Sequence, residues 1–238
     1  MQKLINGAKE LGIDLTPAQV EQFELYYKEL VDWNKRMNLT AITNYDDVQV
    51  KHFLDSLTLL QAASELASKL NLRFLDIGTG GGFPGIPLKI VFPTITLTLI
   101  ESTGKKTTFL HHLLDVLSLN DVTVLNERSE SLAHRDDCRA QFDIAACRGV
   151  ATLATACELT LPFCKQGGVF IAQKKGTIDE EMRKASSAIE KLGGELKGIE
   201  RINLSAFEEE HLLVIVHKIG PTPDTYPRRP GIPAKRPL

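Results

Sequence analysis

Short apolar runs alternate with stretches of helical periodicity from residue 72 onward, and this alternation constrains the fold more than any other feature. The runs have the length of buried strands, which we expect at 72–77, 95–100, 122–126, 142–147, 168–173 and 211–218. The stretches between them predict helices at 85–91, 104–118, 151–164 and 179–191. Strands that alternate with helices form a parallel sheet covered on both faces. The sequence therefore predicts an α/β fold.

The segment before the first strand, residues 1–70, is predicted to be a helical extension. Thr16 and Gln19 form a helix-capping signal, and apolar residues follow at helical spacing. A second amphipathic run starts at Val50 and continues toward Leu70.

Residues 71–218 would then form the sheet domain. Their last stretch holds two strand candidates around the acidic residues 208–210, with no helix between them. This pattern predicts a hairpin, whose antiparallel strand would close the sheet.

Residues 219–238 are expected to form an extended arm, because their six prolines suit neither a helix nor a sheet ladder. The arm is basic, although the whole chain has a net charge of −2. Its cations would neutralise RNA phosphates, and those that we expect to do so are Arg228, Arg229, Lys235 and Arg236. Tyr226 would stack on a base or fasten the arm to the domain. The alternative is a solvated tail that only keeps the protein soluble.

The composition of the chain argues against a membrane protein, a secreted protein and a zinc protein. No apolar run reaches membrane-spanning length, and Lys3, Asn6 and Lys9 interrupt the first ten residues, so we expect no secretory signal and a soluble, cytoplasmic protein. The four cysteines, at 138, 147, 157 and 164, form no C-x-x-C pair. This spacing argues against a zinc site, and we expect no metal and reduced, packing thiols.

The segment 74–85, with the sequence FLDIGTGGGFPG, is a strand that runs into a glycine turn and a helix start. In one frame Gly80, Gly82 and Gly85 match G-x-G-x-x-G, which cradles a dinucleotide pyrophosphate. In the other frame Asp76, Gly78, Gly80 and Gly82 match D-x-G-x-G-x-G, the first motif of methyltransferases that bind S-adenosylmethionine.

Polar residues after the second and third predicted strands help to decide between a dinucleotide and S-adenosylmethionine. Glu101 ends the second strand, where either cofactor presents its ribose hydroxyls. Ser129 and Glu130 follow the third strand, where an adenine would be contacted. Together with Asp76, this pair favours S-adenosylmethionine.

Over essentially its whole length, the chain resembles the bacterial 16S rRNA guanine-N7 methyltransferases known as the glucose-inhibited division protein B family. The resemblance rests on motifs along the chain: WNK at 33–35 with NLT at 38–40, HFLDS at 52–56, the glycine loop at 76–87, RSE at 128–130, Arg148, Lys174, and YPRRPGIP at 226–233. It implies a Rossmann-like methyltransferase sheet, S-adenosylmethionine as donor, and a guanine in the decoding-centre region of 16S rRNA or the small ribosomal subunit as acceptor.

The resemblance also implies site residues. The cofactor contacts carried over by motif are Gly78, Phe83, Glu101, Ser102, Thr103, Ser129, Glu130 and Arg148, to which the glycine loop adds Asp76 and Gly80. Arg148, Lys174 and His52 are the expected catalytic residues, and Asn38 is expected to contact RNA. The family commonly has Leu-Lys and a small residue where this chain has Gln173-Lys174-Lys175, so Lys175 is the alternative to Lys174.

Guanine N7 has an exposed lone pair and no proton, so its methylation needs positioning and charge relief rather than a general base or a metal. Three alternatives remain open: a cysteine nucleophile such as Cys147 or Cys164, a methyltransferase for another base or a small molecule, and a nucleoside-binding regulator without turnover. His52 and Asp55 would share a helix face that either contacts substrate or packs on the sheet domain.

Overall fold

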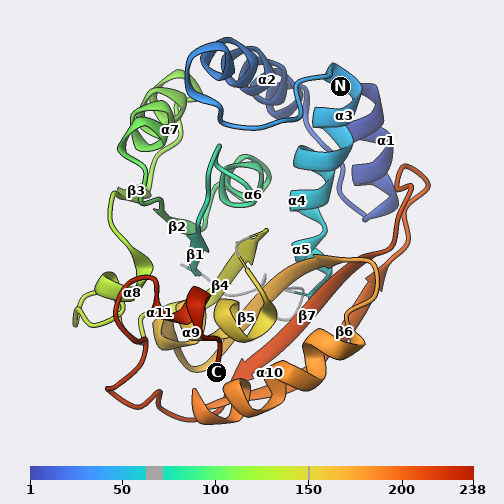
Figure 1. Ribbon diagram of the computed structural model, residues 1–238. Coiled ribbons are helices and arrows are strands. Elements are labelled where there is room, and N and C mark those ends of the chain that lie inside the picture. Colours follow the sequence, from blue (N-terminus) through green and yellow to red (C-terminus); the bar gives the residue numbers. More distant parts are fainter. Residues whose placement is uncertain (63–71, 150) are drawn as a thin grey trace.

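The computed structural model describes residues 1–62, 72–149 and 151–238, which form a seven-stranded sheet flanked by helices (Figure 1). The strands are β1 (Arg73–Ile77), β2 (Thr96–Ile100), β3 (Val122–Leu125), β4 (Phe142–Arg148), β5 (Cys164–Lys175), β6 (Gly194–Ile202) and β7 (His211–Lys218). Their order is β3-β2-β1-β4-β5-β7-β6, and only the pairings of β7 with β5 and β6 are antiparallel. The strand order reverses between β1 and β4, so a ligand crevice is expected beyond the carboxyl ends of these strands.

Helices precede the sheet and connect its strands. The amino-terminal ones are α1 (Gln2–Glu10), α2 (Pro17–Met37), α3 (Tyr45–Val48), the π-helical turn η1 (Gln49–Leu54), α4 (Asp55–Leu57) and α5 (Leu59–Ala62). The later ones are α6 (Gly85–Val91), α7 (Gly104–Val116), α8 (Ser129–Leu132), α9 (Leu153–Thr160), the 3₁₀ turn η2 (Leu161–Phe163), α10 (Asp179–Lys191) and α11 (Ile232–Lys235). Among the described residues, no helix is both long and apolar enough to cross a membrane.

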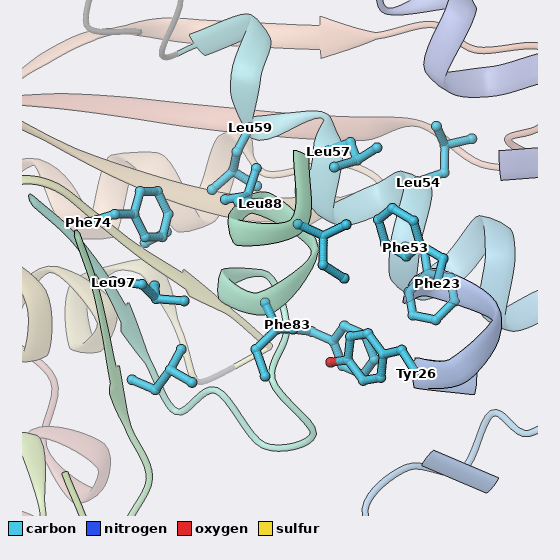
Figure 2. Packing of buried hydrophobic residues seen from close by; sticks show 14 of the residues in the cluster. Phe23, Tyr26, Phe53, Leu54, Leu57, Leu59, Phe74, Phe83, Leu88 and Leu97 are labelled. Carbon is cyan, nitrogen blue, oxygen red and sulfur yellow. The ribbon is translucent and has the colours of Figure 1, made fainter. Parts of the chain in front are cut away.

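Two hydrophobic clusters cover the two faces of the sheet, because successive strand residues point to opposite sides. In β1, Phe74 belongs to the cluster shared with α2, α6 and α7, whereas Leu75 and Ile77 belong to the cluster shared with α9 and α10. Figure 2 shows the first cluster, in which Phe23 and Phe53 pack beside Tyr26 and Phe83. The amino-terminal helices therefore share one core with the sheet.

The capping signal at residues 16–19 is confirmed. Thr16 accepts the backbone N–H of Gln19, the Gln19 side chain accepts the N–H of Thr16, and α2 begins at Pro17. The run after Val50 forms η1, α4 and α5 in succession instead of one regular helix. Its predicted continuation toward Leu70, and the boundary between residues 70 and 71, lie outside the described residues.

Two expectations about the carboxyl half are wrong in detail. The helix predicted at 151–164 ends at Thr160, because Pro162 cannot donate a helical hydrogen bond, and Cys164 already pairs with Phe142 in the sheet. The predicted hairpin forms, but its antiparallel strand β7 lies inside the sheet and β6 is the edge strand.

The sequence predicts an extended arm at the carboxyl terminus, but this segment packs against the domain. Its Ile232–Lys235 portion is helix α11, which lies beside α9 (Figure 1), and Thr222 and Pro233 are buried. Prolines do exclude a sheet ladder here, but side chains of the domain satisfy the segment's carbonyls instead: Arg139 donates to the carbonyls of Thr222 and Tyr226.

Candidate active site

The glycine loop leaves β1 through residues that need a left-handed backbone. Gly78, Gly80 and Gly82 have φ of 69°, 58° and 100°, values that glycine adopts without steric cost. At Gly85, a Cβ would lie 2.6 Å from a Leu99 methyl carbon, so this position also requires the smallest residue. The loop is thereby able to bring its backbone close to a ligand.

Asp76, at the end of β1, braces this loop. Its Oδ2 accepts hydrogen bonds from the hydroxyl of Thr79 at 2.7 Å and from the N–H of Gly85 at 2.8 Å. Its Oδ1 is buried and has no partner among the described residues. Burial raises the pKa of Asp76 to about 6, despite the two donors.

Glu101 ends β2 and holds the loop from the other side. Its Oε2 accepts the N–H of Gly80 at 3.1 Å, and its Oε1 accepts the N–H of Thr103 at 2.8 Å. Each carboxylate oxygen can accept two hydrogen bonds, so each has capacity left for a ligand donor. Glu101 therefore combines a fixed orientation with free acceptor capacity.

A cavity of about 180 Å³, here called the β2–β3 cavity, opens beside Glu101. The site residues that line it are Gly78, Glu101, Ser102, Arg128, Ser129 and Glu130. The opposite lining comes from α9 and from Gly231 and Ala234 of the carboxyl-terminal segment. The N–H of Gly231 donates to Glu130 Oε1 at 2.9 Å, so this segment forms part of the cavity.

A second cavity, of about 450 Å³, lies at the ends of β4 and β5 and is here called the β4–β5 cavity. Its lining residues are Ile42, Lys51, His52, Asp55, Arg148, Gly149, Gln173, Lys174 and Lys175. They come from the amino-terminal helices as well as from the sheet. The two cavities lie on either side of the switch point between β1 and β4, where a crevice is expected.

Arg148 is the central cation of the β4–β5 cavity. Its guanidinium donates to Asp55 Oδ2 at 3.0 Å, to the Lys51 carbonyl at 3.1 Å and to His52 Nδ1 at 3.2 Å. The other carboxylate oxygen of Asp55 accepts from His211 Nδ1 at 2.7 Å. Although burial alone would raise the pKa of Asp55, the bonds from His211 and Arg148 lower it, so the carboxylate stays charged.

The contacts of His52 fix its protonation. An arginine can only donate, so the ring nitrogen that faces Arg148 must be bare, and Nε2 carries the proton that bonds Thr40 Oγ1 at 2.7 Å. Burial and the charge of Arg148 lower the pKa of His52 to about 4. His52 also stacks on Phe83, with ring centroids 4.4 Å apart. The imidazole is neutral near pH 7 and cannot act as a general acid there.

Lys174 and Lys175 point to different partners. Lys174 Nζ bonds the Ala151 carbonyl at 2.9 Å and Glu181 Oε1 at 2.6 Å, and the side chain is mostly buried. Lys175 pairs with Glu209 at the surface. Gln173, the departure from the family pattern, donates to the Asp55 carbonyl at 2.6 Å, and its Oε1 is buried with no partner in the described part of the chain.

Other predicted site residues lie outside the two cavities. Phe83 stacks on Tyr26 and His52 in the first hydrophobic cluster, and Thr103 precedes α7 without lining either cavity. Asn38 ends α2 in a left-handed conformation and is exposed. Of these two cavities, Arg148 lines the β4–β5 cavity, so its expected contact with the cofactor stays a prediction.

The four cations predicted to bind RNA differ in accessibility. Arg228 forms a two-point ion pair with the fully buried Glu158, so its guanidinium is already engaged. Arg229, Lys235 and Arg236 are exposed.

The surroundings of the cysteines argue against a cysteine nucleophile. All four cysteines are buried, and burial raises the pKa of both Cys147 and Cys164 to about 12. A thiol that remains protonated at neutral pH is a poor nucleophile.

Sequence reasoning missed His211 and the contribution of Gly231 and Ala234. A lone histidine at a strand start carries no local signal, since its partner Asp55 is 156 positions away. The glycine between prolines in the arm was a usable signal, because Gly231 has φ of 82° and directly precedes α11 as its N-cap.

Comparisons with known proteins identify relatives of this chain. The family model described as GidB, rRNA small subunit methyltransferase G, matches residues 19–213. The ribosomal RNA small subunit methyltransferase G of Dehalococcoides mccartyi strain CBDB1 is 49% identical over 238 residues, with both chains covered completely. That of Bacillus subtilis strain 168 is 41% identical over 238 residues, covering all of this chain and 98% of the relative.

Solved structures resemble the fold at low sequence identity. The YcgJ protein of Bacillus subtilis aligns with a TM-score of 0.54 and 13% identity, covering 71% of this chain and all of that one. A mutant of MtNAS in complex with S-adenosylmethionine aligns with a TM-score of 0.56 and 14% identity, covering 85% and 72%. The predicted α/β sheet of the Rossmann-like methyltransferase type is confirmed.

Proposed function

Because this chain belongs to the rRNA small subunit methyltransferase G family, we propose that it transfers a methyl group from S-adenosylmethionine to N7 of a guanine in 16S rRNA, in the decoding-centre region. Its substrate is the rRNA or the small ribosomal subunit, which makes the cytoplasm its place of action. The observation that carries the proposal is the pair of cavities on either side of the switch point of the sheet. One is lined by carboxylates that can accept hydrogen bonds from ribose hydroxyls, and the other is lined by cations.

The residues of the β2–β3 cavity fit the nucleoside end of the donor. Glu101 has acceptor capacity left for two ribose hydroxyls after binding two backbone N–H groups. Ser129 and Glu130 provide polar groups for the adenine. Gly78 and Gly80 would bring the loop backbone toward the methionine end, and the buried Oδ1 of Asp76 at the start of the loop has no partner within the described part of the chain. When bound, S-adenosylmethionine supplies an electrophilic sulfonium methyl group.

The β4–β5 cavity fits the acceptor base. Its volume of about 450 Å³ lies within the range of roughly 300–1,000 Å³ that is typical of ligand pockets. Arg148 and Lys174 are donors suited to guanine O6, and holding O6 orients the base while N7 stays free to attack. Asp55, which is itself held by His211, fixes the guanidinium, so Arg148 is ordered before the base arrives.

No proton has to leave guanine N7, and the site is built accordingly. His52 is neutral near pH 7. Its ring stacks on Phe83, and its Nδ1 accepts the hydrogen bond that orients Arg148. Lys51 and Lys175 are paired at the rim with Asp47 and Glu209, as exposed ion pairs that exchange readily for RNA phosphates.

The decisive experiment compares rRNA nucleosides by mass spectrometry in cells with and without the gene. We expect loss of one 7-methylguanosine from 16S rRNA, restored by the wild-type gene but not by a Glu101→Ala, Arg148→Ala double variant. Loss of a methyl group from another base would redirect the proposal to a different acceptor. An unchanged nucleoside profile, together with cofactor binding by the purified protein, would support the nucleoside-binding regulator.

A further inference from the structure

We propose that the carboxyl-terminal arm, residues 219–238, is a wall of the cofactor site, with α11 covering the nucleoside end of the bound donor. This inference rests on the proposed function, and it assigns the arm a role other than RNA binding. Two of the arm's residues, Gly231 and Ala234, line the β2–β3 cavity together with Glu101, Ser129 and Glu130.

A buried ion pair holds the arm in place. Glu158, in α9, is fully buried, and both of its carboxylate oxygens accept from the Arg228 guanidinium, at 2.8 and 2.6 Å. The backbone N–H of Arg228 adds a bond of 2.8 Å to the same carboxylate. Arg228 also donates to the Arg236 carbonyl at 2.7 Å, which ties the segment before α11 to the residue that follows the helix. A buried carboxylate needs such a partner, so Arg228 is not free to leave for RNA.

Further contacts position the arm over the cavity. The buried hydroxyl of Thr155 donates to the Pro233 carbonyl at 3.0 Å, and His134 bonds the Pro227 carbonyl at 2.8 Å. Gly231 reaches Glu130 with its N–H at 2.9 Å. That bond orients the carboxylate, and among the described residues Oε2 accepts a long hydrogen bond from the Ser129 hydroxyl, at 3.5 Å. Glu130 is thus oriented by the arm and retains acceptor capacity for an exocyclic amino group such as that of adenine.

The assignment of the arm to the cofactor, rather than to RNA, follows from which of its groups are engaged. The Arg228 side chain is paired with Glu158. Backbone N–H groups of the arm donate to Glu130 and to Glu158 in α9. The exposed cations Arg229, Lys235 and Arg236 lie on the outside. The inner side of the arm therefore serves the cofactor, and only the outer side is available to phosphates.

Two matched pairs of variants test this inference, with S-adenosylhomocysteine as the calorimetric probe. Ala234→Trp places a large ring at the cavity and should weaken binding at least tenfold. Ile232→Trp places the same ring on an exposed residue of α11 that does not line the cavity, and should stay within twofold of wild type. Because both positions are at the surface, neither change needs to disturb folding.

The second pair is Arg228→Ala against Arg229→Ala, each of which removes one positive charge. Arg228→Ala should raise the KM for S-adenosylmethionine at least tenfold with little change in kcat or in the KM for RNA, and Arg228→Lys should recover part of the loss. Arg229→Ala should leave S-adenosylhomocysteine affinity unchanged. A merely structural role for Arg228 would instead lower kcat and both affinities in proportion to the unfolded fraction.

The outcomes separate the inference from the proposed function. If wild type binds S-adenosylhomocysteine and Ala234→Trp binds it equally well, the arm is no wall of the cofactor site, whereas the methyltransferase proposal stands. If wild type does not bind S-adenosylhomocysteine at all, both proposals fail.

Discussion

Acidification should destabilise the protein through His52. The imidazole has a pKa of about 4 in the folded protein, because burial and the neighbouring Arg148 disfavour its charged form, against 6.5 for an unperturbed histidine. Between these two pH values the unfolded chain binds a proton that the folded chain does not. The free energy of unfolding therefore falls as the pH drops below 6.5, and the loss levels off near pH 4.

The magnitude follows from the two pKa values. Lowering the pH from 7.5 to 5 should cost about 2 kcal/mol through His52 alone. For a chain of 238 residues this corresponds to a decrease of roughly 4–8 °C in Tm. Asp76, whose pKa is raised to about 6, opposes this trend in the same pH range, because the folded state then binds the extra proton. A variant that removes only His52 is therefore needed to isolate its share.

The assay is Tm against pH by circular dichroism for wild type, His52→Gln and His111→Gln. Glutamine cannot titrate, so the Tm of His52→Gln should fall by roughly 4–8 °C less than that of wild type over this interval. His111 lies exposed on α7, and its replacement should reproduce the wild-type slope. Parallel curves for wild type and His52→Gln would refute the claim that His52 is held neutral by burial and by Arg148.

Four further outcomes are expected. Glu101→Ala should weaken S-adenosylhomocysteine binding by about 1–3 kcal/mol through unpaired ribose hydroxyls, and an unchanged calorimetric Kd would contradict the ribose assignment. Arg148→Ala should lower methyl transfer at least tenfold, about 1.4 kcal/mol in barrier, and should also lower Tm because it leaves the buried Asp55 with His211 as its remaining side-chain partner. Cys147→Ala should retain methyl transfer within a few-fold in a radiolabel assay, and complete loss would revive the nucleophile alternative. Replacing Arg229, Lys235 and Arg236 together by Ala should flatten the salt dependence of RNA affinity without altering cofactor affinity; superimposable log-log slopes would show that these cations make no phosphate contacts.

The sheet and the glycine loop could be predicted from the sequence because their signals are local. Strand residues alternate between the two cores within β1 itself, and the turn glycines begin directly after Ile77, the last residue of that strand. The position of β7 inside the sheet could not be predicted, since a hairpin pattern fixes which strands pair but not which of the two lies at the edge.

The contacts of Arg228 and Gly231 could not be predicted from the sequence, because their partners are far away along the chain. Arg228 and Glu158 are 70 positions apart, and Gly231 and Glu130 are 101 positions apart. A basic, proline-rich segment has the same composition whether it is solvated or docked. What distinguishes the two cases is a buried carboxylate on another helix, and nothing in the local pattern around Glu158 indicates that it is buried.

The amino-terminal helices belong to the chemistry of the site as much as the strands do. The Tyr26 hydroxyl donates to the Gly81 carbonyl at 2.6 Å, so α2 holds the glycine loop from outside the sheet. Asp55 supplies the negative charge that keeps Arg148 ordered in a mostly buried position. In the proposed site, the nucleoside half lies at the ends of β1, β2 and β3, with Gly231 and Ala234 on the opposite side. The proposed acceptor half requires a second wall with a buried carboxylate, since a mostly buried guanidinium without one would be costly. The helices that precede β1 supply that wall, which is why the cavity assigned to guanine lies where they meet β4 and β5.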